Sequence, residues 1–179
     1  GDGKILEPYQ FTIAMYRALS CKRLPTDYAG NANLFSTQRP FNAETVFSFY
    51  APTDTASGTD ILAPEQKLLN AEEFNARLGQ LRWMNWAPVL KEGEEASRLS
   101  LAAAGCDING LIAANKLSAD AFFDYVSPRF FRGGMPATLK QEMVRIRSEL
   151  LAKDYLTDLQ SASTLLQYAL TSPYYGAQR

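Results

Sequence analysis

The chain has 179 residues, of which 46% are hydrophobic and 21% are charged, proportions typical of one folded, well-packed globular domain. Its 18 basic and 19 acidic side chains give a formal net charge of -1, which argues against a nucleic-acid ligand or an anionic membrane surface. The sequence contains no histidine, so it excludes histidine-activated nucleophiles, histidine general bases and histidine metal ligands.

The first predicted helix begins at Pro8, since proline is well tolerated in the first turn of a helix. Phe11, Met15 and Leu19 are spaced four residues apart and predict one buried helical face. We expect Pro25 to end this helix. The N-terminal residues that precede this helix are polar and show no signal peptide. The sequence contains no run of 18 apolar residues, so we expect no transmembrane helix.

The next part of the chain is predicted to be mostly irregular. Residues 26–42 form a long loop rich in turn-forming residues, and Asn42 is a suitable N-cap for a short helix from Ala43 to Tyr50. The apolar composition of that helix predicts burial on more than one side. Residues 51–62 form a second long loop, and loops of that length are usually functional or mobile.

Pro64 begins the longest predicted helix, which extends to about Ala87 and is stopped by Pro88. Its apolar residues recur at helical spacing and are expected to be buried; they are Leu68, Leu69, Phe74, Leu78, Leu81 and Met84. A weaker helix is predicted from Glu94 to Ala104.

The last third of the chain predicts four helices. A short one runs from after Asn109 to about Asn115, and the next is capped by Ser118 and breaks near Pro128. Gly133 and Gly134 form a further break. Two well-patterned helices follow, from Pro136 to Lys153 and from Tyr155 to a stop at Ser172-Pro173.

No segment alternates apolar and polar residues as a strand does, so the predicted fold class is all-α, an irregular multi-helix bundle with long loops near residues 26–42 and 51–62. We expect residues 1–179 to form a single helical domain. Cys21 and Cys106 permit one disulfide, and two buried free thiols are an equally ordinary outcome. Two cysteines are too few for a structural metal site, and we predict no metal and no cofactor.

Four segments resemble a bacterial family of large, mostly exported proteins, the domain-of-unknown-function family 1800. They are Gly3-Lys4-Ile5-Leu6-Glu7-Pro8, Arg39-Pro40-Phe41-Asn42 with Val46-Phe47-Ser48-Phe49-Tyr50, Leu62-Ala63-Pro64-Glu65 with Leu68-Leu69-Asn70, and Leu170-Thr171-Ser172-Pro173-Tyr174-Tyr175. Their order and spacing agree with the family pattern. Leu6 stands where the family usually has arginine, and Glu44 where it has proline.

The resemblance implies that this chain is the C-terminal part of a longer exported protein, located in the periplasm or secreted. It also implies that a histidine-containing motif lies in the missing N-terminal part. The family has no settled activity that can be carried over to these residues.

The best local candidate for a ligand site combines Arg39, Asn42 and Glu65. An arginine fork suits a carboxylate or phosphate, while Asn42 and Glu65 lie at predicted helix starts. The alternative, which we favour, is that all three are structural: a loop ion pair, a helix cap and a dipole-complementing acid. Trp83 and Trp86 share a helical face and could stack on a sugar ring, although such a pair is more often part of the core.

Other charged groups predict ordinary solvated surface. The acid pairs Glu72-Glu73 and Glu94-Glu95 point away from each other on their helices, and Arg77 gives the first pair i, i+4 support. A calcium site would draw on Asp54, Asp60, Asp107 and Asn109, but no complete acidic loop is present. A mildly basic zone is interrupted by acids and is interpreted as mixed surface; its members are Arg129, Arg132, Lys140, Arg145, Arg147 and Lys153.

Two functions remain open. The favoured one is a noncatalytic helical binding or scaffold module, whose partner is the missing N-terminal part of the same protein, another envelope protein or a polysaccharide. The alternative is the C-terminal half of a hydrolase-like enzyme, in which Arg39, Asn42 and Glu65 line a cleft completed by the missing part. The absence of histidine and of any nucleophile motif favours the first, and we assign no catalytic residue to this chain.

Overall fold

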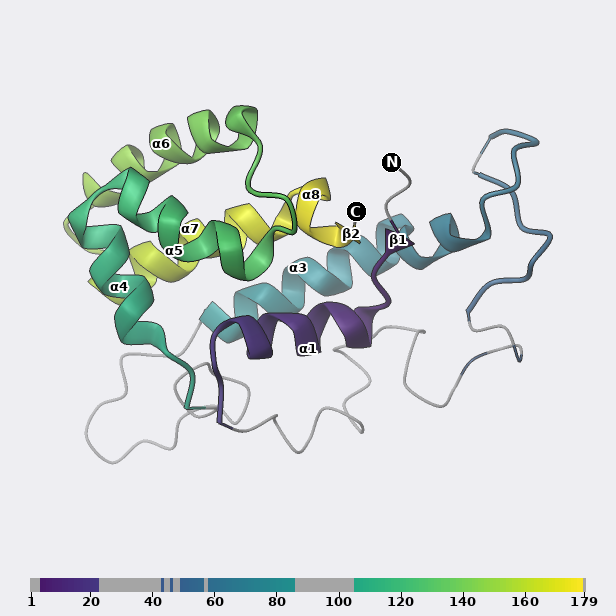
Figure 1. Ribbon diagram of the computed structural model, residues 1–179, viewed down its shortest axis with the longest axis horizontal. Helices are drawn as coiled ribbons and strands as arrows, with labels where there is room; N and C mark the ends of the chain where they lie inside the picture. The colour runs from purple at the N-terminus through teal and green to yellow at the C-terminus, as the bar shows by residue number, and fades with distance from the viewer. Residues whose placement is uncertain are drawn as a thin grey trace.

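The described residues form an all-α fold, as the sequence predicted (Figure 1). The computed structural model describes residues 4–22, 43, 46, 49–56, 58–85 and 105–178. Their helices are α1 (Pro8–Ala18), η2 (Pro64–Leu69), α3 (Ala71–Asn85), α4 (Ile108–Leu117), α5 (Ala119–Phe130), α6 (Ala137–Leu151), α7 (Asp158–Thr171) and α8 (Pro173–Gly176).

Two very short strands join the two ends of the described chain. β1 (Lys4–Ile5) pairs antiparallel with β2 (Ala177–Gln178), with Lys4 opposite Gln178. The amide of Leu6 continues the pairing by donating to the carbonyl of Gly176 at 3.0 Å. The helical fold is therefore closed by a minimal ladder at which its first and last elements meet.

Helix α1 begins as predicted at Pro8, and it buries Phe11 and Met15. The backbone amide of Glu7 donates to the side chain of Gln10, which helps to cap the first turn. The helix ends at Ala18, earlier than the predicted stop at Pro25, because the chain turns through a positive φ at Ser20. Pro25 itself lies outside the described residues.

The predicted long helix from Pro64 is two helices. η2 is a 3-10 helix that ends before Asn70, whose extended backbone interrupts it and whose side chain accepts a hydrogen bond from the amide of Glu73 at 2.8 Å. Asparagine side chains compete for backbone amides in this way and favour caps over helix interiors. α3 therefore starts anew at Ala71, and Phe74, predicted to be buried, is 42% exposed.

Helices α4 and α5 follow directly on each other. Asp107 caps α4 by accepting from the amide of Gly110, and Ser118 caps α5 as predicted, accepting from the amide of Ala121. α5 ends at Phe130, close to the break predicted near Pro128, which itself lies in the last turn of the helix. Proline removes one amide donor, but the amide of Phe131 still donates to the carbonyl of Ser127 and completes the last turn.

The last part of the chain agrees with the sequence prediction in outline. α6 lies within the predicted range from Pro136 to Lys153, and α7 starts at a capping box between Thr157 and Gln160. Pro173 follows the end of α7, as predicted, and it also begins the single-turn helix α8.

The predicted helix from Ala43 to Tyr50 is wrong for the residues that can be described there. Ala43, Val46, Phe49 and Tyr50 are not helical, and Val46 is 95% exposed rather than buried. A helix this short gains few backbone hydrogen bonds, so apolar composition alone does not stabilise it. The predicted loop at 26–42 and the predicted helix from Glu94 to Ala104 lie outside the described residues.

The described part of the second predicted loop, residues 51–62, is not helical and folds back on itself. Thr55 forms an isolated bridge with Leu62, and the amide of Ala56 donates to the carbonyl of Ile61 at 2.8 Å. Asp54 accepts from the amide of Ala51 and from Lys67 of η2, at 2.7 and 2.6 Å. The loop is thus tied to η2 at its base.

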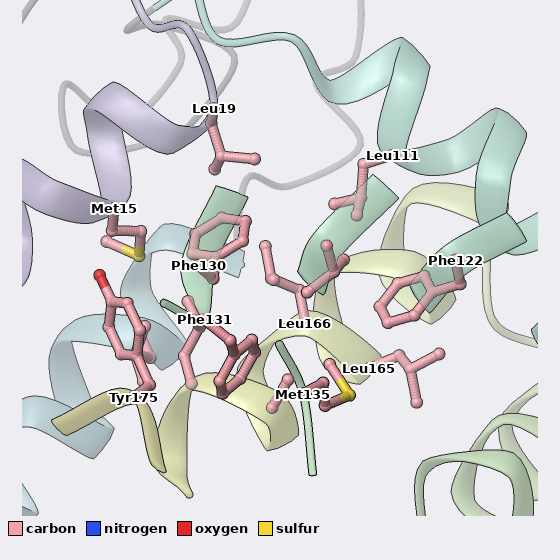
Figure 2. Close-up of a cluster of buried hydrophobic side chains, with 14 of the residues drawn as sticks. Met15, Leu19, Leu111, Phe122, Phe130, Phe131, Met135, Leu165, Leu166 and Tyr175 are labelled. Atoms are coloured by element: carbon pink, nitrogen blue, oxygen red, sulfur yellow. The ribbon is translucent and has the colours of Figure 1, made fainter. Parts of the chain in front are cut away.

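Helix α7 lies at the centre of the core and packs against α3, α4, α6 and α8. Figure 2 shows Leu165 and Leu166 of α7 surrounded by side chains from α1, α4, α5 and α8. Those neighbours are buried and include Met15, Leu19, Leu111, Phe122, Phe130, Phe131 and Tyr175. Burial of this cluster is the main stabilising term of the fold.

A disulfide between Cys21 and Cys106 joins the end of α1 to the start of α4. Beside it, the amide of Asp107 donates to the carbonyl of Leu19 at 2.8 Å. Helix α1 is therefore fixed at its C-terminal end by this bridge and at its N-terminal end by the β1–β2 ladder.

Candidate functional site

A groove of about 990 Å³ lies between α1, the segment that follows α5, and α8. One face of α1 forms its first wall, through residues spaced over two turns of the helix: Tyr9, Gln10, Ile13, Ala14 and Arg17. Tyr9 is 46% exposed and Arg17 is exposed, so this face is open to solvent.

The second wall is the end of α5 and the turn from Phe131 to Pro136. Gly133 and Gly134 both have positive φ, at 86° and 90°, a conformation that glycine adopts without strain. The hydroxyl of Ser127 accepts a hydrogen bond from the amide of Met135 at 2.8 Å, and the amide of Gly134 donates to the carbonyl of Phe131. These bonds hold the turn against α5.

Tyr175 of α8 forms the floor of the groove. Its ring makes edge contacts with Phe11, Phe130 and Phe131 at centroid distances of 4.8, 5.9 and 6.3 Å, and Figure 2 shows it beside the last two. Its hydroxyl donates to the carbonyl of Phe11 at 3.0 Å. Burial raises the pKa of Tyr175 far above the ordinary value for a phenol, so this hydroxyl acts as a structural donor.

Three arginines line the groove, and no aspartate or glutamate appears among its described lining residues. Arg129 lies over the ring of Tyr125 at 3.9 Å and donates to the Tyr125 carbonyl at 2.8 Å. Within the described part of the chain, the guanidinium groups of Arg17 and Arg132 make no hydrogen bond or ion pair. The groove therefore presents uncompensated positive charge beside aromatic surface.

Tyr125 holds Arg129 and is itself held by the cap of α4. Its hydroxyl donates to the carboxylate and to the carbonyl of Asp107, both at 3.1 Å. Burial, reinforced by the negative charge of Asp107, raises the pKa of Tyr125 to about 12. The phenol therefore stays neutral over the whole physiological range and keeps its donor.

A smaller hollow of about 490 Å³ adjoins the groove on the other side of the glycine turn. It shares Arg132 with the groove and adds Asp124 and Lys140. Lys140 lies over the ring of Phe123 at 5.6 Å. The Arg132–Gly134 turn lines both hollows and forms the ridge between them.

Among the predicted ligand residues, Glu65 alone has a side chain that the structure describes. Arg39, Asn42 and Trp86 lie outside the described residues, as does the side chain of Trp83. Glu65 lies in the first turn of η2, is partly exposed and is not part of the groove lining. The described residues contain no group of three acidic or cysteine side chains that could hold a metal ion, and so none at Asp54, Asp60 or Asp107.

The predicted solvent exposure of the Glu72-Glu73 pair is wrong for Glu73. Glu72 is exposed, but Glu73 is fully buried and Arg77 is 4% exposed. Arg77 donates to the carbonyls of Leu6 and Leu68 at 2.6 and 3.0 Å, and its guanidinium lies 5.3 Å from the centre of the Phe11 ring.

The reason for this burial is that α3 turns this face toward the β1 and η2 backbone rather than toward solvent. Burial lowers the pKa of Arg77, while the negative charge of Glu73 opposes that shift. Arg77 therefore acts as an internal tie between α3, η2 and the residue that follows β1.

Sequence reasoning missed the groove, although one signal was present. Arg129 and Arg132 flank Phe130 and Phe131, and the sequence predicts that the two arginines are part of a mixed surface. Both arginines are exposed, as predicted, but the two phenylalanines anchor the wall that carries them. The contribution of α1 comes from more than 110 positions earlier in the chain and has no local signal.

Comparison with known proteins found no match: no protein-family model, no curated protein and no solved structure matches the sequence. Among the helices that the structure describes, none has the length and apolar character needed to cross a membrane.

Proposed function

We propose that this chain is a helical binding module of an exported bacterial protein, and that the groove between α1, the α5–α6 turn and α8 holds a segment of a partner protein. The groove itself is the observation that carries the proposal. In view of the resemblance to family 1800, the partner we favour is another part of the same protein or a second envelope protein.

The composition of the groove fits protein recognition. Tyrosine, phenylalanine and arginine are enriched at interface centres, where they supply large contact areas at low entropic cost. Tyr9 and Tyr174 are partly exposed at the edge of the groove, while Phe130, Phe131 and Tyr175 are buried beneath it. A groove with rigid aromatic support and exposed aromatic edges is suited to hold a peptide segment.

The lining supports binding rather than hydrolysis. Its described residues are leucine, isoleucine, alanine, proline, glycine, phenylalanine, tyrosine, glutamine and arginine. None of these carries a carboxylate, thiol or aliphatic hydroxyl that could serve as nucleophile or general base near neutral pH. The one buried phenol, Tyr175, has its hydroxyl committed to the carbonyl of Phe11.

Selection of peptides from a random displayed library tests the proposal, with a variant that fills the groove as the discriminating probe. Ala14 lies on the groove face of α1, and Ala14→Trp places a large side chain there. The matched control is Ala113→Trp, on an exposed position of α4 that is absent from the groove lining.

We expect selected peptides to bind the unchanged chain and the Ala113→Trp variant and to lose at least tenfold in affinity for Ala14→Trp. Thermal unfolding of both variants verifies that each is folded. Selected peptides that bind Ala14→Trp as well as Ala113→Trp would show that the groove is not the binding site, and the proposal would be abandoned.

A further inference from the structure

We infer that the segment held in this groove is acidic, with carboxylate side chains placed against Arg17, Arg129 and Arg132 and apolar or aromatic side chains between them. This inference rests on the proposed function and specifies the chemistry of the partner. The groove face of α1 from Tyr9 to Arg17 spans about 12 Å, since a helix rises 1.5 Å per residue. That length accommodates roughly four residues of extended peptide.

Charge complementarity carries the argument. Three arginines line the groove without an acidic side chain among its described residues, whereas Arg145 of α6, an exposed arginine in another described part of the chain, contacts both Glu142 and Glu149. Like charges gathered without counterions repel one another, and an anionic ligand relieves that repulsion. A guanidinium also binds a carboxylate through two parallel hydrogen bonds, which adds direction to the attraction.

One of the three arginines is already ordered for binding. Arg129 stacks on Tyr125, and Tyr125 is held by two hydrogen bonds to Asp107, so the guanidinium loses little freedom when a ligand arrives. The smaller hollow continues the positive surface past the glycine turn through Lys140, with Asp124 as its single described acid.

The donor set favours a peptide over a neutral sugar. Arginine side chains only donate hydrogen bonds, and Gln10 is the one amide side chain among the described lining residues. Sugar hydroxyls donate as well as accept, and the lining offers them few acceptors. A carboxylate only accepts, which matches a groove whose charged groups only donate.

Fluorescence anisotropy with two labelled octapeptides tests the inference. One alternates glutamate with tyrosine, and the other alternates glutamine with tyrosine, so they differ in charge and hardly in shape. A labelled oligogalacturonate, which is an anionic sugar, represents the competing class of ligand, a polysaccharide. The protein variants are Arg17→Gln, Arg132→Gln and the double variant, with Lys153→Gln as the control, since Lys153 is an exposed cation outside both hollows.

We expect the glutamate peptide to bind at least tenfold more tightly than the glutamine peptide and to weaken as salt rises from about 50 to about 300 mM. Each single arginine variant is expected to weaken binding about two- to fivefold and the double variant about tenfold, as for solvent-accessible ion pairs. Lys153→Gln is expected to change it less than twofold.

The outcomes separate this inference from the proposed function. If both peptides bind equally well and neither binds the Ala14→Trp variant, the groove remains the binding site, but the inferred preference for an acidic segment is overturned. Tighter binding of oligogalacturonate than of the glutamate peptide would overturn the peptide in favour of a sugar. Failure of the glutamate peptide to bind would also overturn the inference, and insensitivity of all library-selected peptides to Ala14→Trp would overturn the proposed function itself.

Discussion

Two helical glycines offer a sharp test of the packing around the groove. Gly79 lies in α3 and Gly110 in the first turn of α4. A Cβ added at Gly79 meets no described atom within 4 Å, whereas one added at Gly110 lies 2.7 Å from the Asp107 carboxylate and 2.9 Å from the ring of Tyr125. The same substitution, glycine to alanine, is therefore expected to have opposite effects at the two sites.

The magnitudes follow from three contributions. Alanine in place of a helical glycine stabilises a fold by about 0.5–1 kcal/mol, and Gly79→Ala should gain that amount. Gly110→Ala gains the same amount but displaces the Asp107 cap, which costs about 1 kcal/mol, and overpacks Tyr125, which costs about 1–3 kcal/mol. The net effect at Gly110 is a loss of about 2 kcal/mol.

Thermal unfolding followed by circular dichroism at 222 nm measures both changes. For a chain of this size one kcal/mol corresponds to about 2–4 °C, so we expect a rise of about 2 °C for Gly79→Ala and a fall of about 4–8 °C for Gly110→Ala. If Gly110→Ala is as stable as Gly79→Ala, the close packing of Asp107, Gly110 and Tyr125 is incorrect, and with it the account of how Arg129 is positioned.

Three further predictions concern the ties that hold the fold. Arg77→Met removes the buried hydrogen bonds to the carbonyls of Leu6 and Leu68 and the positive charge that acts on buried Glu73, and should cost about 3–5 kcal/mol in urea unfolding. Glu73→Gln/Arg77→Met should recover part of that loss, and a double variant no more stable than Arg77→Met would refute the electrostatic coupling of the two residues. Reduction of the disulfide releases a loop of 85 residues and should cost about 3–5 kcal/mol, or about 10 °C in the melting temperature. The double variant Cys21→Ser/Cys106→Ser should have the melting temperature of the reduced protein, and dithiothreitol should not change it. Equal melting temperatures of the oxidised and reduced protein would contradict the predicted stabilisation by the disulfide. The hydrogen bond from Lys67 lowers the pKa of Asp54 below 3.8, so the stabilisation from this pair is present above pH 3.8 and is lost on further acidification. Lys67→Met should raise the pKa of Asp54 toward 3.8 in a carbon-detected NMR titration, and an unchanged pKa would show that the ion pair is absent in solution.

The helix ends that could be predicted from the sequence are those with a strong local signal. Pro8 at the start of α1, Ser118 at the cap of α5 and Pro173 after α7 each act within one turn of the backbone they control. The errors arose where a local signal was outweighed by another. Asn70 lies within an apolar helical pattern, yet its side chain ends one helix and caps the next.

The groove and the burial of Arg77 could not be predicted because they depend on distant segments. Arg77 is buried since its partners are two distant carbonyls, that of Leu6 directly after β1 and that of Leu68 in η2. The groove likewise needs Arg17 and Arg132 in one lining, which the packing of α1 against the end of α5 provides. Periodicity describes one helix at a time and carries no information about which helices become neighbours.

The pairing of β1 with β2 has a consequence for how freely this fold can be rearranged. Since the chain comes in and leaves at adjacent positions, with Lys4 opposite Gln178, a few residues could link the two ends without disturbing a single helix. A circularly permuted chain opened within the exposed turn at Gly58 should then reach the same packing. The same geometry should allow the domain to be inserted into a surface loop of a host protein, where it would fold as a separate unit without separating the two ends of that loop.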